Sequence, residues 1–163
     1  MPAPDDPTPP GSYAFVLKMT DQPGGMEVIG ATFAHRGVSL GCSLGNDGTL
    51  DPEGRATVIV TFSATPAKKE VLRRALGRLS RVRSLVEHPM DSPDLRKTAV
   101  FRVAGQEDLT RLADHPLERI THDAATDETT YLLVASPASV DSFLAGLRRS
   151  GSLRDVTTTV IGL

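Results

Sequence analysis

Residues 20–26 read TDQPGGM, and they lie where one element of secondary structure should end and the next begin. Before them, residues 13–20 alternate strongly apolar with less apolar side chains, which is the period of a strand with one buried face. Beyond them, Met26, Ile29 and Phe33 recur at helical spacing. The stretch therefore predicts a strand, a tight glycine turn and a helix.

The two adjacent glycines, Gly24 and Gly25, let the turn fold tightly and leave backbone N–H groups of the first helical turn uncovered. Such a helix start attracts small anions, and an amino acid carries a carboxylate of suitable size. An ordinary strand-to-helix turn, with Asp21 capping the helix, fits the same residues. Gly30 predicts a close approach of the helix to the sheet, and Gly37 predicts a left-handed cap at the helix end.

The first half continues with the pattern of strand, hairpin, strand, helix and strand. Residues 38–44 read as a strand, residues 45–54 as a polar turn, and residues 56–62 as an alternating strand. Thr65 followed by Pro66 predicts a capped helix start. The apolar stripe behind it consists of Val71, Leu72, Ala75, Leu76 and Leu79, and residues 82–86 predict a closing strand.

The same order recurs less distinctly in the second half, after a linker with two prolines and two aspartates at residues 89–94. The predicted elements are strands at residues 95–103, 117–122, 129–134 and 153–160, and a short helix at residues 106–114. A second helix begins at Ser136-Pro137 and carries Val140, Phe143, Leu144 and Leu147 on one face.

A repeat relates the two halves. Ala64-Thr65-Pro66-Ala67 and Ala135-Ser136-Pro137-Ala138 lie 71 residues apart, and at the same offset Leu72, Leu76 and Val82 correspond to Phe143, Leu147 and Leu153. The repeat predicts an α+β fold of two tandem ferredoxin-like βαββαβ units with antiparallel sheets. The predicted boundaries are residues 1–11, 12–88, 89–94 and 95–163, as leader, first unit, linker and second unit. Open sheet edges favour a homodimer or a higher homo-oligomer.

Composition describes a globular chain with a modest core. The 163 residues carry a net charge of −2, which gives no general attraction to nucleic acid or acidic membranes. Cys42 is the only cysteine, so an intramolecular disulfide is impossible and a reducing cytoplasm is expected. No apolar run approaches the ~20 residues that cross a bilayer. Residues 1–11 hold five prolines and predict a disordered leader without a secretion signal.

The strand-to-helix stretch resembles an ACT domain, and specifically the first one in the small, regulatory subunit of acetolactate synthase. The resemblance rests on Asp21-Gln22-Pro23-Gly24-Gly25-Met26, then Ile29, Phe33 and Arg36-Gly37, with Leu40 in the next strand. Residues 71–86 also resemble the second helix and strand of that family. Residues 139–144 and 160–163 are similar to the end of its C-terminal domain, so the resemblance covers nearly the whole chain after the leader.

This resemblance implies regulation without catalysis and without a cofactor. The family's small subunit binds a branched-chain amino acid between two ACT domains of a dimer and acts on a thiamine-dependent catalytic subunit. Carried over to this chain, the effector loop consists of Asp21, Gly24, Gly25 and Met26, and the partner protomer supplies Ser39 and Leu40. Asp21 and Ser39 stand where the synthase family carries asparagine, and Asp21 can accept a bond from a ligand ammonium group.

A basic cluster supports a rival hypothesis, a stand-alone interaction module that binds protein or RNA. The cluster consists of Lys68, Lys69, Arg73, Arg74, Arg78, Arg81 and Arg83. Ferredoxin-like RNA binders stack bases on aromatic side chains of the sheet, and no central strand here carries such a motif, so nucleic acid is not expected. A solvated helix face is favoured over nucleic-acid binding for this cluster, and a docking surface for an acidic partner subunit lies between the two.

Catalytic and metal sites have no support in the sequence. The four histidines, His35, His88, His115 and His122, lack the spacing of a metal site. Cys42 has no catalytic histidine nearby and predicts a buried structural thiol. No nucleophile elbow, Walker sequence or Rossmann glycine pattern occurs. The chain is therefore expected to be a regulatory protein and not an enzyme.

Overall fold

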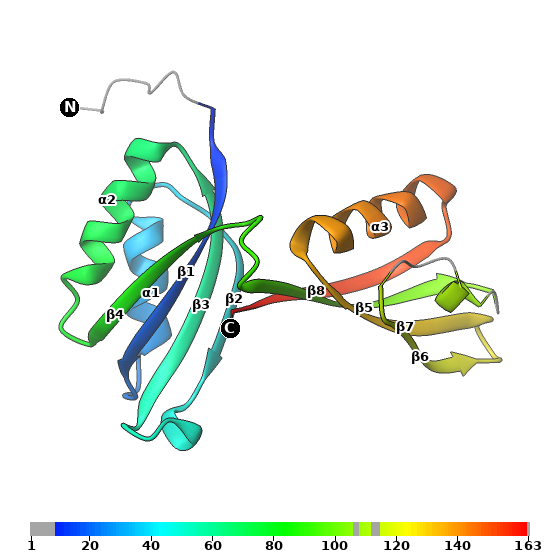
Figure 1. Cartoon of the computed structure of the whole chain (residues 1–163), viewed down its shortest axis with the longest axis horizontal. Helices are drawn as coiled ribbons and strands as arrows, with labels where there is room; N and C mark the ends of the chain where they lie inside the picture. Colours follow the sequence, from blue (N-terminus) through cyan, green and yellow to red (C-terminus); the bar gives the residue numbers. More distant parts are fainter. Residues whose placement is uncertain (1–8, 106–107, 112–114, 163) are drawn as a thin grey trace. The chain divides into compact units, whose positions relative to one another are not determined.

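The computed structural model describes residues 9–105, 108–111 and 115–162 (Figure 1). The chain divides into two compact units, Met1–Met90 and Asp91–Leu163. Each unit contains one four-stranded antiparallel sheet, with strand orders β2-β3-β1-β4 and β6-β7-β5-β8. Because the two orders are equivalent, the predicted α+β class and tandem ferredoxin-like layout are confirmed.

The first unit has the complete βαββαβ order. Its elements are β1 (Gly11–Thr20), α1 (Gly25–Ala34), β2 (Leu40–Asn46), the 3₁₀ turn η1 (Gly48–Leu50), β3 (Arg55–Ala64), α2 (Pro66–Gly77) and β4 (Val82–Pro89). β1 begins at Gly11, inside the predicted leader, because Gly11 pairs with Ala64 on β3. The leader prediction for residues 1–8 lies outside the described residues. β4 is three residues longer than predicted, since Tyr13 and Ala14 still pair with Pro89 and His88.

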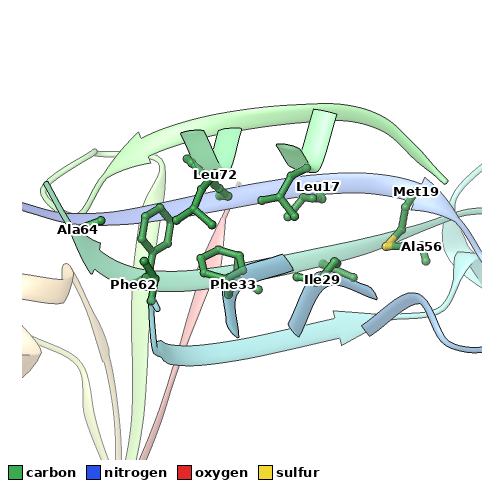
Figure 2. Close-up of a cluster of buried hydrophobic side chains, with 13 residues drawn as sticks. Leu17, Met19, Ile29, Phe33, Ala56, Phe62, Ala64 and Leu72 are labelled. Atoms are coloured by element: carbon green, nitrogen blue, oxygen red, sulfur yellow. The ribbon is translucent and has the colours of Figure 1, made fainter. Parts of the chain in front are cut away.

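The core of the first unit lies between one sheet face and both helices (Figure 2). Ile29 and Phe33 of α1 and Leu72 of α2 meet the buried face of β1 and β3 there. Phe62 lies among three aromatic rings, with its centroid 4.7 Å from Phe15, 5.1 Å from Phe33 and 5.9 Å from Tyr13. Edge-on and tilted ring contacts stabilise the core in addition to the burial of apolar area. This aromatic cluster therefore holds α1 against the sheet.

The end of α1 matches the glycine prediction. Gly37 has φ 62°, and its N–H donates to the Ala34 carbonyl at 3.0 Å. The Val38 N–H donates to the Phe33 carbonyl at 3.2 Å, which completes a Schellman motif. Val38 and Phe33 are both buried in the core, as this motif favours. Because Val38 belongs to the cap, β2 begins at Leu40, two residues later than predicted.

The prediction that Gly30 allows a close approach of α1 to the sheet is wrong, because no heavy atom lies within 4 Å of the position that a Cβ would take there.

Gly30→Ala should therefore raise the free energy of unfolding by about 0.5–1 kcal/mol, through helix propensity. Gly37→Ala should lower it by about 1–2 kcal/mol, because alanine disfavours the left-handed region. Denaturant unfolding of the two variants measures both effects. A change of the same sign in the free energy of unfolding of both variants would contradict these backbone assignments.

α2 begins with the predicted cap, since the Thr65 side chain accepts a hydrogen bond from the Lys68 N–H and Pro66 is the first helical residue. Leu72 and Leu76 are fully buried. Val71 is 49% exposed, so its assignment to the apolar stripe is wrong. It neighbours Leu72 in sequence but lies about 100° around the helix from it, beyond the buried face.

The second unit consists of β5 (Leu95–Ala104), the 3₁₀ turn η2 (Leu109–Arg111), β6 (Leu117–Asp123), β7 (Glu128–Ala135), α3 (Pro137–Ser150) and β8 (Leu153–Gly162). Ser136 caps α3 by accepting from the Ser139 N–H at 3.2 Å, as predicted. The helix predicted at residues 106–114 is only a 3₁₀ turn where it is described. Residues 106–107 and 112–114 of that prediction lie outside the described residues.

Candidate functional site

A cavity of about 410 Å³ opens at the start of α1, and we call it the α1 pocket. Its lining comes from the β1–α1 turn, the end of β2 and the start of β3. The lining residues are Met19, Thr20, Asp21, Gln22, Gly24, Gly25, Met26, Glu27, Gly45, Asn46, Asp47, Ala56 and Val58. Four of the six predicted site residues, Asp21, Gly24, Gly25 and Met26, are therefore together here.

The helix start in this pocket has no side-chain cap. Gly24 occupies the N-cap position in the left-handed region, with φ 82°, and glycine offers no acceptor to the first helical N–H groups. Thr65 and Ser136 do provide such acceptors at the starts of α2 and α3. The α1 pocket thus lies at the positive end of a helix without a side-chain cap, where the Gly25 N–H donates to the Gln22 carbonyl at 3.3 Å.

Two methionines form adaptable apolar walls. A Cβ on Gly25 would lie 3.0 Å from Met19 Cε, so the Met19 side chain lies directly over this glycine. A Cβ on Gly45 would lie 3.7 Å from Met26 Sδ, so Met26 reaches from α1 toward β2. Met26 is 43% exposed. Flexible thioether side chains fill irregular space and suit the contact with an aliphatic ligand.

The β1–α1 turn is fixed from two sides. The Thr20 N–H donates to the Arg81 carbonyl at 2.9 Å, and the Arg81 guanidinium donates to the Pro23 carbonyl at 2.7 Å. From the other side, the Gly48 N–H donates to Asp21 Oδ2 at 3.4 Å. Asp21 therefore joins the turn to the β2–β3 hairpin instead of capping α1.

The hairpin is organised by Asp51. Its carboxylate accepts from the Glu53 N–H at 2.9 Å and from Arg55 Nε at 3.1 Å, and it lies 3.7 Å from Lys18 Nζ. The Arg55 side chain is the main reason that the pKa of Asp51 falls to about 2. Hydrogen bonds from Thr49 lower the pKa of Asp47, which caps η1. Both carboxylates therefore stay ionised near neutral pH.

The pKa of Asp51 predicts an acid-dependent loosening of this hairpin. The folded-state pKa is depressed from 3.8 to about 2, so the stabilisation is complete above 3.8 and is lost as pH falls through about 2. Carboxyl-carbon NMR should give a titration midpoint near 2 for Asp51, with faster amide exchange at Glu53 and Arg55 below it. In Asp51→Ala, which lacks the acceptor, the exchange should already be fast at neutral pH. A midpoint near 3.8 would contradict the contact with Arg55.

The other two predicted site residues, Ser39 and Leu40, lie elsewhere in the same unit. They line a separate cavity of about 480 Å³ at the opposite end of β2, together with Ser12, Thr61, Phe62, Ser63 and four neighbours. Within a single chain, Ser39 and Leu40 do not line the α1 pocket. Sequence reasoning missed Glu27, Asn46 and Asp47, although the polar turn after residue 44 was a usable signal.

The basic cluster is largely engaged in contacts within the unit. Lys69 pairs with Glu87, Arg73 and Arg74 both pair with Glu70, and Arg81 holds the β1–α1 turn. The Arg73 contact is the main cause of a Glu70 pKa near 2. Only Lys68, Arg78 and Arg83 lack such a contact within the part of the chain that the structure describes. Because Glu70 alone pairs with both Arg73 and Arg74, the described α2 keeps an excess of positive charge.

Cys42 lies in β2 and is half-buried, so the prediction of a buried thiol is wrong. Among the described residues, no group of three or more His, Cys, Asp or Glu side chains could hold a metal ion. Over the same residues, none of the helices combines the length and apolar character needed to span a membrane.

The sequence matches no protein-family model and no curated protein. Solved structures of similar fold include the small subunit of acetolactate synthase from Thermotoga maritima. It is 15% identical, with a TM-score of 0.69, over 93% of this chain and 96% of that chain. The regulatory subunit of aspartate kinase from Thermus thermophilus is 14% identical over 83% of this chain and 91% of that one. Its TM-score of 0.43 is too low to carry an argument. The resemblance expected from the sequence is thus confirmed for the fold.

Proposed function

We propose that this chain is a non-catalytic regulatory subunit that binds a small amino acid in the α1 pocket, between two copies of the chain. The observation that carries the proposal is the pocket itself, where an uncapped helix start, carboxylates and an apolar floor meet. The helix start suits a ligand carboxylate, Asp21 suits an ammonium group, and Met19, Ala56 and Val58 suit an aliphatic side chain. A zwitterion with an apolar side chain satisfies all three.

The arrangement of β2 supports a shared site. β2 is the outermost strand of its sheet, so one edge is open to another strand. If two copies pair their β2 edges antiparallel about Ser43, Leu40 of one copy faces Asn46 of the other, since both lie three residues from Ser43. Asn46 lines the α1 pocket. Such pairing would bring the partner's Ser39 and Leu40 to each pocket and account for all six predicted residues.

We further propose that the dimer modulates a biosynthetic enzyme in the cytoplasm, with the catalytic subunit of a thiamine-dependent acetolactate synthase as the first candidate. A branched-chain amino acid is the effector class that the sequence resemblance implies. The likeness in fold to a small subunit of that enzyme supports this choice of partner. A pull-down with the catalytic subunit from the same organism, with and without effector, tests it.

Thermal unfolding of the full chain with each of the twenty amino acids tests ligand binding. A ligand that binds only the folded state at a hundred times its Kd adds about 2.7 kcal/mol, which raises Tm by roughly 5–10 °C if the whole chain unfolds as one cooperative unit. We expect a selective rise for a small set of amino acids. No rise with any amino acid at millimolar concentration would contradict the proposal.

A further inference from the structure

The α1 pocket has an uneven charge balance. Three carboxylates, those of Asp21, Glu27 and Asp47, belong to its lining, and none of its described lining residues is Lys, Arg or His. The nearby cations have other contacts. Lys18 donates to Thr57 Oγ1 at 2.7 Å and pairs with Asp51. Arg81 bonds the neutral Pro23 carbonyl and keeps its charge beside Glu27, since Arg81 Nη1 and Glu27 Oε2 lie 3.6 and 3.7 Å from the Cβ position of Gly24. A ligand therefore enters a site where three carboxylates face one guanidinium, a net charge of about −2.

A neutral amino acid leaves part of this charge unbalanced. Its ammonium group offsets one carboxylate, and its own carboxylate uses the positive end of α1. Arg81 offsets a second carboxylate, and one then remains without a cation. Asp21 and Asp47 each accept a backbone N–H bond, at 3.4 and 3.1 Å, and keep further lone pairs for a ligand. Glu27 lies in the first turn of α1, where it opposes the entry of a second anionic group.

The pocket has an apolar floor, formed by Met19, Ala56 and Val58, and an acidic rim, formed by Asp21, Glu27 and Asp47. This arrangement suits an extended ligand side chain. Met19, Ala56 and Val58 are buried, whereas Asp21, Glu27 and Asp47 are exposed. An aliphatic stem can thus lie against the floor and the Met26 thioether while its end reaches the carboxylates in water. Long cationic side chains bind in this way, with the methylenes on apolar surface and the charge in solvent.

We propose that the effector of the α1 pocket is an α-amino acid whose side chain ends in a cation, of the lysine, ornithine or arginine class. This inference rests on the proposed binding of an amino acid at this site, and it departs from the branched-chain class that the sequence resemblance implies. The carboxylates at the rim select for the second positive charge, and the apolar floor selects for the methylene stem.

Calorimetric titration of the full chain with lysine, norleucine and valine tests the proposal. Norleucine has the four side-chain carbons of lysine without the ammonium group. Lysine should bind at least tenfold more tightly than norleucine, which corresponds to about 1.4 kcal/mol. Binding of norleucine or valine as tight as that of lysine would overturn the inference and leave the proposed function standing. No binding of any amino acid would overturn both.

Charge-neutralising variants test whether Asp47 and Glu27 cause the preference for lysine. Asp47→Asn and Glu27→Gln keep the side-chain shape, and Asn can still cap η1. Each should weaken lysine binding about threefold, as expected for one partly exposed charge pair, and leave norleucine binding unchanged. Asp141→Asn removes the same charge from α3 and should leave lysine binding unchanged. An equal loss in Asp141→Asn, or none in both pocket variants, would overturn the assignment to the rim.

Discussion

Replacing Phe62 by alanine should lower the free energy of unfolding of the first unit by about 3–5 kcal/mol. Phe62 is 3% exposed, and its ring lies 4.7 Å from that of Phe15 and 5.1 Å from that of Phe33. Truncation would remove these contacts and leave a cavity between β3 and α1. Since Phe33 fixes α1 to the sheet, the same change should weaken the helix whose start forms the α1 pocket.

Denaturant unfolding followed by far-UV circular dichroism measures this loss. Val86→Ala is the matched control, because Val86 is 50% exposed on β4 of the same sheet. The control should change the free energy of unfolding by less than about 0.5 kcal/mol. A loss in Phe62→Ala no larger than in Val86→Ala would contradict the packing of α1 on the sheet.

Gly25→Val should weaken amino-acid binding at least tenfold, or by about 1.4 kcal/mol, without unfolding the chain. A Cβ at Gly25 already meets Met19 Cε at 3.0 Å, so the two valine methyls would displace Met19 into the pocket or occupy it themselves. Gly25 is the first residue of α1 and is not one of the glycines with positive φ, so valine is compatible with its backbone. The variant therefore separates occupancy of the pocket from stability of the fold.

Gly77→Ala is the control for this variant. It adds a methyl group to α2, where no heavy atom lies within 4 Å of the Cβ position, and it should leave binding unchanged. Titration of each variant with the tightest-binding amino acid provides the measurement. Undiminished binding by a folded Gly25→Val chain would place the ligand elsewhere than the α1 pocket.

The fold was predictable from the sequence because its signals are local. Thr65-Pro66 and Ser136-Pro137 both start helices, and Gly37 adopts the left-handed conformation that its position required. Val71 and Gly30 were wrongly assigned because spacing alone does not say how wide the buried face of a helix is. The start of β2 was predicted two residues too early, because Val38 has the side chain of a strand residue but belongs to the cap of α1.

The α1 pocket was predictable only in part. The glycine turn indicated where α1 begins, and it predicted the uncapped helix start. The lining from outside the turn comes from Gly45, Asn46, Asp47, Ala56 and Val58, which lie about twenty or more residues away in sequence and reach the turn through strand pairing. Asp21 is the clearest example. Its sequence position suggested a helix cap, whereas its carboxylate accepts from Gly48 on the hairpin.

The central claim is that an amino acid binds between two copies of this chain. A ligand at such an interface must strengthen association, because binding and dimerisation are thermodynamically linked. Sedimentation equilibrium with and without a saturating amino acid measures this linkage directly. We predict that the dimer dissociation constant falls at least tenfold with the amino acid that binds and does not change with its 2-oxo acid, which lacks the ammonium group. The same dissociation constant with every amino acid would contradict the claim.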